Sequence, residues 1–327
     1  MRTLKEICLA NGAIDAKLDA VKSGDIVVAN AQAAGFAVPL QFSQALTAFS
    51  AGLVGNMNSA ELQKFIAPHM RTPKNFEYAV SDRLDAFDRP KLAQMRRARG
   101  GEYPYAGTKT ELAKGSLSDF GLAVKIDKDD YSEEFQRAML ERLQRMINDA
   151  LLEGTIDMLD AMAVSTEISL ATLGDTTTLD AAIADELEEA RKLGGIMPNR
   201  ILFGGTAWSM RKKYYESKAL AGSTLAFPRT AADFTQDIRA KTEIMDALTV
   251  SDTGALEMLA GNTIYAFYGQ DAPGLDDPSN MKTAFGGEDH VYTGQNEQGT
   301  LHVLATGTNK ELLPVCPKGV VKIVLTD

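Results

Sequence analysis

The chain has 327 residues, of which 45% are hydrophobic and 24% charged, the composition of a globular protein that buries a large core without a metal or disulfide. Its formal net charge of −10 argues against a protein whose main surface grips nucleic acid. Two cysteines, Cys8 and Cys316, can pair only once, which excludes a disulfide scaffold or a cysteine-rich metal site and favours synthesis in a reducing cytoplasm.

The first part of the chain, residues 1–73, is Ala-rich and predicts an arm rather than a packed domain. Residues 1–12 lack the apolar core of a secretory signal, and a short helical pattern covers residues 14–21. The most apolar stretch, residues 26–40, is interrupted by polar residues, glycine and proline, so we expect no membrane-spanning segment.

A strand is predicted at residues 76–80, and a long basic excursion follows it. Residues 83–99 carry six basic residues against Asp85 and Asp88. The chain then returns through a second predicted strand, residues 121–126. Residues 82–126 therefore predict an extended β-hairpin loop with little core of its own, and loops of this length are usually functional or bound to something.

A long helix is predicted at residues 131–163, where apolar residues recur at helical spacing. Asp130 or Ser132 can cap its N-terminus, and Glu133 and Glu134 place negative charge in the first turn, where it suits the helix dipole. An unbroken helix of this length measures about 45–50 Å and acts as a beam.

A compact α/β region is predicted to follow. Helices are expected at residues 179–192, from residue 206 onward and at residues 229–240. Strands are expected at residues 200–203, 244–250, 263–268, 300–305 and 319–325, with a loop-dominated stretch at residues 270–299.

Two short motifs raise the alternative of a hydrolase. Asp252-Thr253-Gly254 matches the triplet of aspartic peptidases, but that chemistry needs two carboxylates and no second triplet is present. A turn after the strand that ends at Val250 explains the same residues. Ser209 and Lys212 satisfy S-x-x-K, in which a lysine activates a serine, without the motifs that accompany it. We therefore expect no catalytic residue.

No cofactor or metal site is expected either. The three histidines stand far apart in the sequence. Asp127, Asp129 and Asp130 begin like a calcium loop but lack its turn glycine and its final glutamate, so helix capping explains them better. Glycine motifs that cradle phosphates are absent.

Opposite charges on the excursion and at the start of the long helix predict a contact between copies of the chain. The basic side consists of Arg96, Arg97 and Arg99. The acidic side consists of Asp127, Asp129, Asp130, Glu133 and Glu134. A phosphate contact or a solvated loop would explain the arginines alone, whereas a contact between subunits explains both sets of charges.

The order of these elements resembles the major capsid proteins of tailed bacteriophages, the Hong Kong 97-type coat fold. Residues 119–159 are similar to the family's return strand and spine helix, and residues 198–213 to a strand and helix of its axial domain. The resemblance implies an α+β fold. Its parts are an N-terminal arm (1–73), an extended loop (82–126), a peripheral domain (74–81, 127–178 and 300–327, with spine helix 131–163) and an axial α/β domain (179–299).

The resemblance implies a structural protein, not an enzyme. It implies a major capsid protein that is made in the cytoplasm of a host bacterium and assembles as hexamers and pentamers into the icosahedral shell of the virion. Portal and scaffolding proteins, and a decoration protein, are the implied partners, and packaged DNA is contacted only non-specifically. An encapsulin-like nanocompartment shell, which has the same fold, is the close alternative. A hydrolase that uses Asp252 or Ser209 is the alternative of another class.

Overall fold

The computed structural model describes residues 58–80, 111–130, 132–173, 178–220, 230–250, 256–275, 277–287, 289–295 and 300–327. The chain divides into two compact units, each built from separate stretches of sequence. The described residues of unit 1 lie within Met1–Phe76, Gly115–Ala161 and Thr283–Leu313, and those of unit 2 lie within Glu77–Lys114, Met162–Lys282 and Pro314–Asp327. Residues 1–57 of the predicted arm and residues 81–110 of the predicted loop lie outside the described residues, as do Cys8 and Asp252.

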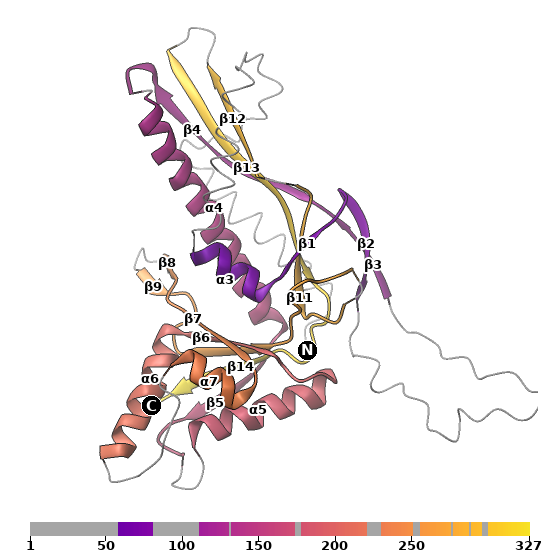
Figure 1. Ribbon diagram of the computed structural model, residues 1–327, viewed down its shortest axis with the longest axis vertical. Coiled ribbons are helices and arrows are strands. Elements are labelled where there is room, and N and C mark those ends of the chain that lie inside the picture. The colour runs from indigo at the N-terminus through magenta and orange to yellow at the C-terminus, as the bar shows by residue number, and fades with distance from the viewer. Residues whose placement is uncertain are drawn as a thin grey trace, which may run out of the picture. The chain divides into compact units, whose positions relative to one another are not determined.

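Unit 1 contains a five-stranded sheet organised around the 14-residue strand β13 (Leu301–Pro314). β13 pairs antiparallel with both β4 (Ser118–Asp127) and β12 (His290–Gln295), and it also bonds to β11 (Met281–Phe285). β1 (His69–Arg71) pairs in parallel with β11. The long helix α4 (Glu133–Met162) runs along this sheet (Figure 1). A small apolar core joins them through Ile126, Leu140, Val291 and Leu304.

Helix α4 confirms the predicted helix at residues 131–163. Ser132 is its cap: the Ser132 hydroxyl accepts a hydrogen bond from the Phe135 N–H (3.2 Å), and the Ser132 carbonyl accepts one from the Gln136 N–H (3.0 Å). Phe135 and Met146, three turns apart on α4, are apolar but are 36% and 41% exposed. The apolar stripe of α4 is therefore wider than the part of it that packs in unit 1.

The predicted arm is too long at its C-terminal end. Helix α3 (Asn58–Ile66) and β1 belong to unit 1, where Leu62, Ile66 and Met70 are buried. A segment that buries apolar side chains in this way is part of the core. The helix has only nine residues, and so short an apolar pattern does not distinguish a packed helix from an arm.

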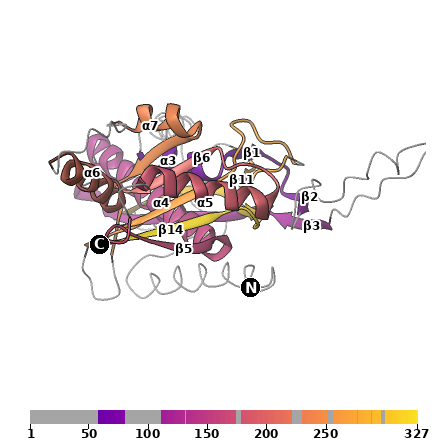
Figure 2. The same ribbon diagram turned by 90° about the horizontal axis from the view of Figure 1, so that it is seen from below.

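Unit 2 contains a five-stranded mixed sheet in the order β5-β14-β10-β6-β7. Its strands are β5 (Val164–Ser169), β14 (Val321–Thr326), β10 (Thr263–Phe267), β6 (Arg200–Gly204) and β7 (Lys241–Met245). Helices α5 (Leu179–Gly194), α6 (Gly205–Leu220) and α7 (Ala231–Ile238) share one apolar core with the sheet, and Figure 2 shows α5 lying against its strands. Phe203, Trp208 and Phe234 meet edge to face in this core, at centroid distances of 5.1 and 5.2 Å from Phe203.

Two caps delimit helices of unit 2. Gly195 ends α5 in the left-handed conformation (φ 81°), and its N–H donates to the Arg191 carbonyl at 2.7 Å. Thr230 and Asp233 form a capping box at the start of α7.

The predicted domain boundaries differ from the structure in several places. β5 and β14, placed in the peripheral domain, lie in the sheet of unit 2. The stretch 270–299, predicted as an axial loop, contains β11 and β12, which join the sheet of unit 1. The strand predicted at residues 244–250 is two strands, β7 and β8 (Leu248–Val250). Alternation within a short strand shows which face is buried but not which sheet the strand joins.

Three short elements complete the described fold. β2 (Asn75–Val80) and β3 (Glu111–Ser116) form a two-stranded sheet, and β8 pairs antiparallel with β9 (Leu256–Met258). A 3-10 turn, η3 (Lys128–Asp130), links β4 to α4. None of the helices in the described stretches is long and apolar enough to cross a membrane.

Candidate interaction surfaces

The acidic side of the predicted contact lies where β4 passes into α4. Asp127, Asp129, Glu133 and Glu134 are all exposed there. The Asp129 N–H donates to Asp127 Oδ1 at 3.1 Å, which fixes the turn. Glu133 forms an ion pair with Arg137 at 2.6 Å, so part of its charge is neutralised within the helix. The structure thus gathers four of the five predicted carboxylates at the start of the long helix.

The remaining residues of that prediction are not described. Arg96, Arg97 and Arg99, together with the side chain of Asp130, lie outside the described residues. The contact between the two sets of charges therefore stays a prediction.

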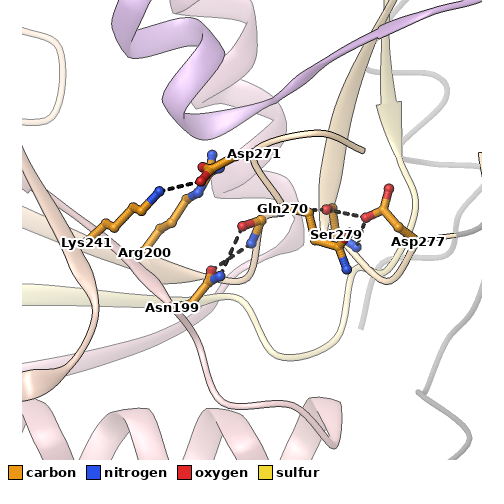
Figure 3. Close-up of polar contacts among 8 residues, drawn as sticks. Asn199, Arg200, Lys241, Gln270, Asp271, Asp277 and Ser279 are labelled. Carbon is orange, nitrogen blue, oxygen red and sulfur yellow. Dashed lines mark hydrogen bonds and ion pairs between the residues drawn. The ribbon is translucent and has the colours of Figure 1, made fainter. Parts of the chain in front are cut away.

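A polar network in unit 2 holds the loop that joins β10 to β11 (Figure 3). Asn199 exchanges two hydrogen bonds with Gly269: Asn199 Nδ2 donates to the carbonyl at 3.0 Å, and Oδ1 accepts from the N–H at 2.9 Å. Asn280 fixes the other end, because its Oδ1 accepts from the Tyr268 N–H at 2.6 Å and its Nδ2 donates to the Cys316 carbonyl at 2.7 Å. The described residues of the stretch 269–280 have no regular secondary structure, and the stretch is anchored at both ends.

A buried lysine anchors the middle of the same loop. The Lys282 side chain is 0% exposed, and its Nζ donates to the carbonyls of Gly274 (2.7 Å) and Leu275 (3.1 Å). Nζ also lies 2.8 Å from Asp277 Oδ2. Asp277 Oδ1 accepts from the Ser279 N–H at 2.8 Å. One ammonium group and one carboxylate thus hold the turn of the loop.

Asp271 lies on the surface of this loop and bridges two cations. Arg200, whose side chain is 3% exposed, donates to Asp271 Oδ1 at 2.7 Å, and Lys241 donates to Oδ2. The hydrogen bond from Lys241, together with both positive charges, holds the pKa of Asp271 below its ordinary value. Burial lowers the pKa of Arg200. Because Asp271 is exposed, this bridge contributes little stability.

The hairpin β8–β9 in unit 2 carries large exposed apolar side chains. Leu248, Leu256 and Met258 are 55%, 70% and 43% exposed. Leu248 pairs with Met258, and Val250 pairs with Leu256. Figure 1 shows the two strands beyond the end of β7, and in the described chain they pair only with each other. Three of the large exposed apolar side chains in the described part of unit 2 thus lie on this hairpin.

A chain of buried hydrogen bonds crosses unit 1 and ends at His69. Gln63 Nε2 donates to Thr283 Oγ1 at 2.8 Å, and that hydroxyl donates to the Ala67 carbonyl at 3.1 Å. Gln63 therefore presents its Oε1 to His69 Nε2, which lies 2.7 Å away and carries the proton. The neutral imidazole donates the hydrogen bond that Gln63 Oε1 accepts, so these hydrogen bonds need no second proton on the ring.

Protonation of His69 is strongly disfavoured in the folded chain. Burial, followed by the positive charges of Lys310 and Lys64, lowers the pKa of His69 to about 4, against the opposing effect of Asp289. Burial also lowers the pKa of Lys310. A charged imidazole would add a third positive charge to those of Lys310 and Lys64 in a largely buried position.

We expect His69 to make the folded chain acid-sensitive. The unfolded chain binds a proton at His69 below about pH 6.5 and the folded chain only below about pH 4, so stability falls as the pH drops through this window. The loss approaches about 3 kcal/mol at its lower end. His69→Gln keeps a donor for Gln63 and removes the titration. Urea unfolding on either side of the window should show a smaller pH dependence for the variant, and identical pH dependences would contradict the prediction.

Ser209 and Lys212, the two residues of the S-x-x-K motif, both lie on α6. Ser209 is exposed on α6, and Lys212 Nζ lies 4.0 Å from Glu216 Oε1, so the lysine is engaged by a carboxylate one turn along the helix. Asp252 is not described, but β8 ends at Val250 and β9 begins at Leu256. The Asp-Thr-Gly triplet lies outside the described residues, so both interpretations of it stay predictions.

Several residues of these surfaces were not found from the sequence. Alternation in Leu248–Val250 and Leu256–Met258, on either side of the turn triplet, was a usable signal for the hairpin. No comparable signal predicts the burial of Arg200, Asp277 or Lys282, because a single charged residue in a short strand or loop is usually exposed to solvent.

Comparison with known proteins places the fold. No protein-family model matches the sequence, and no curated protein is similar to it. Solved structures do match. A phage-related protein from Bordetella bronchiseptica RB50 has a TM-score of 0.61 and 12% identity, over 84% of this chain and 95% of that chain. A virus-like particle from Pyrococcus furiosus has a TM-score of 0.52 and 10% identity, over 87% of this chain and 100% of that chain.

These likenesses confirm the predicted α+β coat fold. They extend over most of this chain and nearly all of each matched chain, so the two units belong to one shared architecture. At such low identity they establish the fold and not the function.

Proposed function

We propose that the protein is the major capsid protein of a tailed bacteriophage, whose copies assemble as hexamers and pentamers into the icosahedral shell around the genome. The observation that supports this most is the fold, which the chain shares over 84% of its length with a phage-related protein and over 87% with the subunit of a virus-like particle. In this proposal the chain is made in the host cytoplasm and ends in the virion, and it has no catalytic residue.

The proposed assembly is a matter of shape and charge. The extended loop of each subunit, with Arg96, Arg97 and Arg99, lies across a neighbour and meets the carboxylates at the start of its α4. Four of those carboxylates are exposed in the structure, as such a contact requires. Repeated contacts of this kind stabilise a closed shell even when each is weak. Portal, scaffolding and decoration proteins are the further partners proposed.

Electron microscopy of the purified full-length chain tests the proposal directly. We expect closed shells of uniform diameter, whose yield falls as ionic strength rises because exposed charges are screened. A stable monomer or dimer under all assembly conditions would contradict the proposal. Shells recovered from cells that carry the gene should contain DNA, whereas protein cargo would favour the nanocompartment alternative.

A further inference from the structure

One face of α4 carries apolar side chains that the described part of unit 1 does not cover. Phe135 is 36% exposed and Met146 is 41% exposed. Because they lie three helical turns apart, both side chains stand on the same side of the helix. Ala138 and Arg142, which are also exposed, occupy the positions between them, and the aliphatic part of an arginine can cover an apolar neighbour. This exposed stripe, from Phe135 to Met146, measures about 17 Å.

The helix α3 begins beside the same stripe. α3 starts at Asn58, and Ser59 Oγ donates a hydrogen bond to Asp149 Oδ1 at 2.5 Å, so the start of α3 lies next to α4 (Figure 1). Asp149 follows Met146 by three residues, which makes the two side chains neighbours on one face of α4. The residues that precede Asn58 are therefore joined to unit 1 near the Met146 end of the exposed stripe.

The sequence that precedes α3 is unusual in charge and pattern. No charged residue occurs between Asp25 and Glu61, whereas segments that stay in water are typically rich in charge. Large apolar residues recur within this stretch at spacings of four, three and four residues, the period of one helical face: Phe42, Leu46, Phe49 and Leu53. The residues between them are all small or polar. The pattern predicts an amphipathic helix at residues 42–53, which lie outside the described residues.

The length of this segment matches that of the exposed stripe. A helix over residues 42–53 measures about 18 Å, against about 17 Å for the stripe. Residues 54–57 can span up to about 14 Å when extended, which is enough to place Leu53 beside Met146. The segment then runs antiparallel to α4, with Phe42 at the Phe135 end. Because the segment carries no charge, it meets no electrostatic repulsion from a chain whose formal net charge is −10.

We propose that residues 42–53 form a helix that docks on the exposed stripe of α4 in the same chain. A helix of this length is marginal in water by itself, so the apolar contact with α4 is what stabilises it. Burial of the stripe gives this part of the predicted arm a fixed place on unit 1. The contact lies within one chain and does not rest on the proposed shell function.

A pair of cysteines tests the docking in the full-length chain. Cys8 is replaced by serine, and Cys316, which is 1% exposed, stays in place. Leu53→Cys with Met146→Cys should form a disulfide within one chain, because docking brings the two Cα atoms within about 7 Å of each other. Leu53→Cys with Arg145→Cys is the matched control and should stay reduced. Arg145 is also exposed, but its side chain points about 100° away from Met146 around the helix.

Mixing isotope-labelled with unlabelled chains before oxidation identifies what occupies the stripe. Linked peptides that carry a single isotope show a contact within one chain, as proposed. Linked peptides that combine the two isotopes would make the occupant a second copy and overturn the proposal. Equal disulfide yields in the two cysteine pairs, or no disulfide in either pair, would overturn it as well.

Oxidation of Met146 by peroxide tests the same contact without added cysteines. Phe49→Asp places a carboxylate on the apolar face of the segment and should raise the oxidation rate of Met146 by about tenfold. Ala51→Asp places the same charge on the opposite face and should leave that rate unchanged. Met158, which is 5% exposed on α4, reports whether each variant keeps its fold. Equal rates at Met146 in the unaltered chain and in Phe49→Asp would overturn the docking.

Discussion

Replacing Asp180 by alanine is expected to lower the free energy of unfolding of unit 2 by about 3–5 kcal/mol, because it leaves a buried guanidinium without its carboxylate. The Arg211 side chain is 1% exposed, and it binds Asp180 in a bidentate manner at 2.8 Å and 2.7 Å. The guanidinium carbon also lies 4.8 Å from the ring centroid of Trp208 and 4.7 Å from that of Phe234. A loss of this size is a large part of the stability of an ordinary domain.

Trp208 provides the measurement. It is the single tryptophan of the chain and packs against Phe203 and Phe234, so its fluorescence reports the unfolding of unit 2. Denaturant titrations should show the transition of Asp180→Ala at a clearly lower midpoint.

A double variant separates the buried charge from other effects of the change. Arg211→Met combined with Asp180→Asn removes both charges and keeps an apolar chain in the core. We expect it to lose less stability than Asp180→Ala alone, because replacing a buried pair by apolar groups is often close to neutral. If the double variant lost as much stability as the sum of the losses of its two single variants, the buried charge would not explain the effect of Asp180→Ala.

The elements that the sequence predicts well are those that carry their own signals. Helix α4 has apolar periodicity, a serine cap and acidic residues in its first turn, and it spans Glu133–Met162 against the predicted 131–163. Helix α5 has a glycine that ends it in the left-handed conformation. Signals of this kind are local in the sequence, so they predict a helix without knowledge of the fold.

Sheet membership is not local, and this limited the prediction. β13 ends at Pro314 and β14 begins at Val321, yet the two strands belong to the sheets of different units. Apolar alternation shows that a strand is half-buried but not which neighbour it pairs with. The acidic part of the candidate contact was predictable because charge is visible in the sequence, whereas the buried charges of the loop depend on tertiary contacts.

The second large effect concerns that loop. Replacing Asp277 by alanine is expected to cost about 3–5 kcal/mol, because the fully buried Lys282 loses its carboxylate. The Ser279 N–H loses its acceptor in the same variant. Denaturant unfolding measures the total, and limited proteolysis should show earlier cleavage within residues 269–280.

The position of the loss can be resolved by hydrogen exchange. The Tyr268 N–H, bonded to Asn280 Oδ1 at 2.6 Å, should exchange faster in Asp277→Ala if the ion pair holds the loop shut, whereas amides of α4 in unit 1 should be unaffected. Asp277→Asn keeps an acceptor for the Ser279 N–H and removes the negative charge, so the difference between the two variants isolates the role of the ion pair. Equal exchange at Tyr268 in the unaltered chain and in both variants would mean that Lys282 is held by the carbonyls of Gly274 and Leu275 alone, and that Asp277 contributes nothing to the loop.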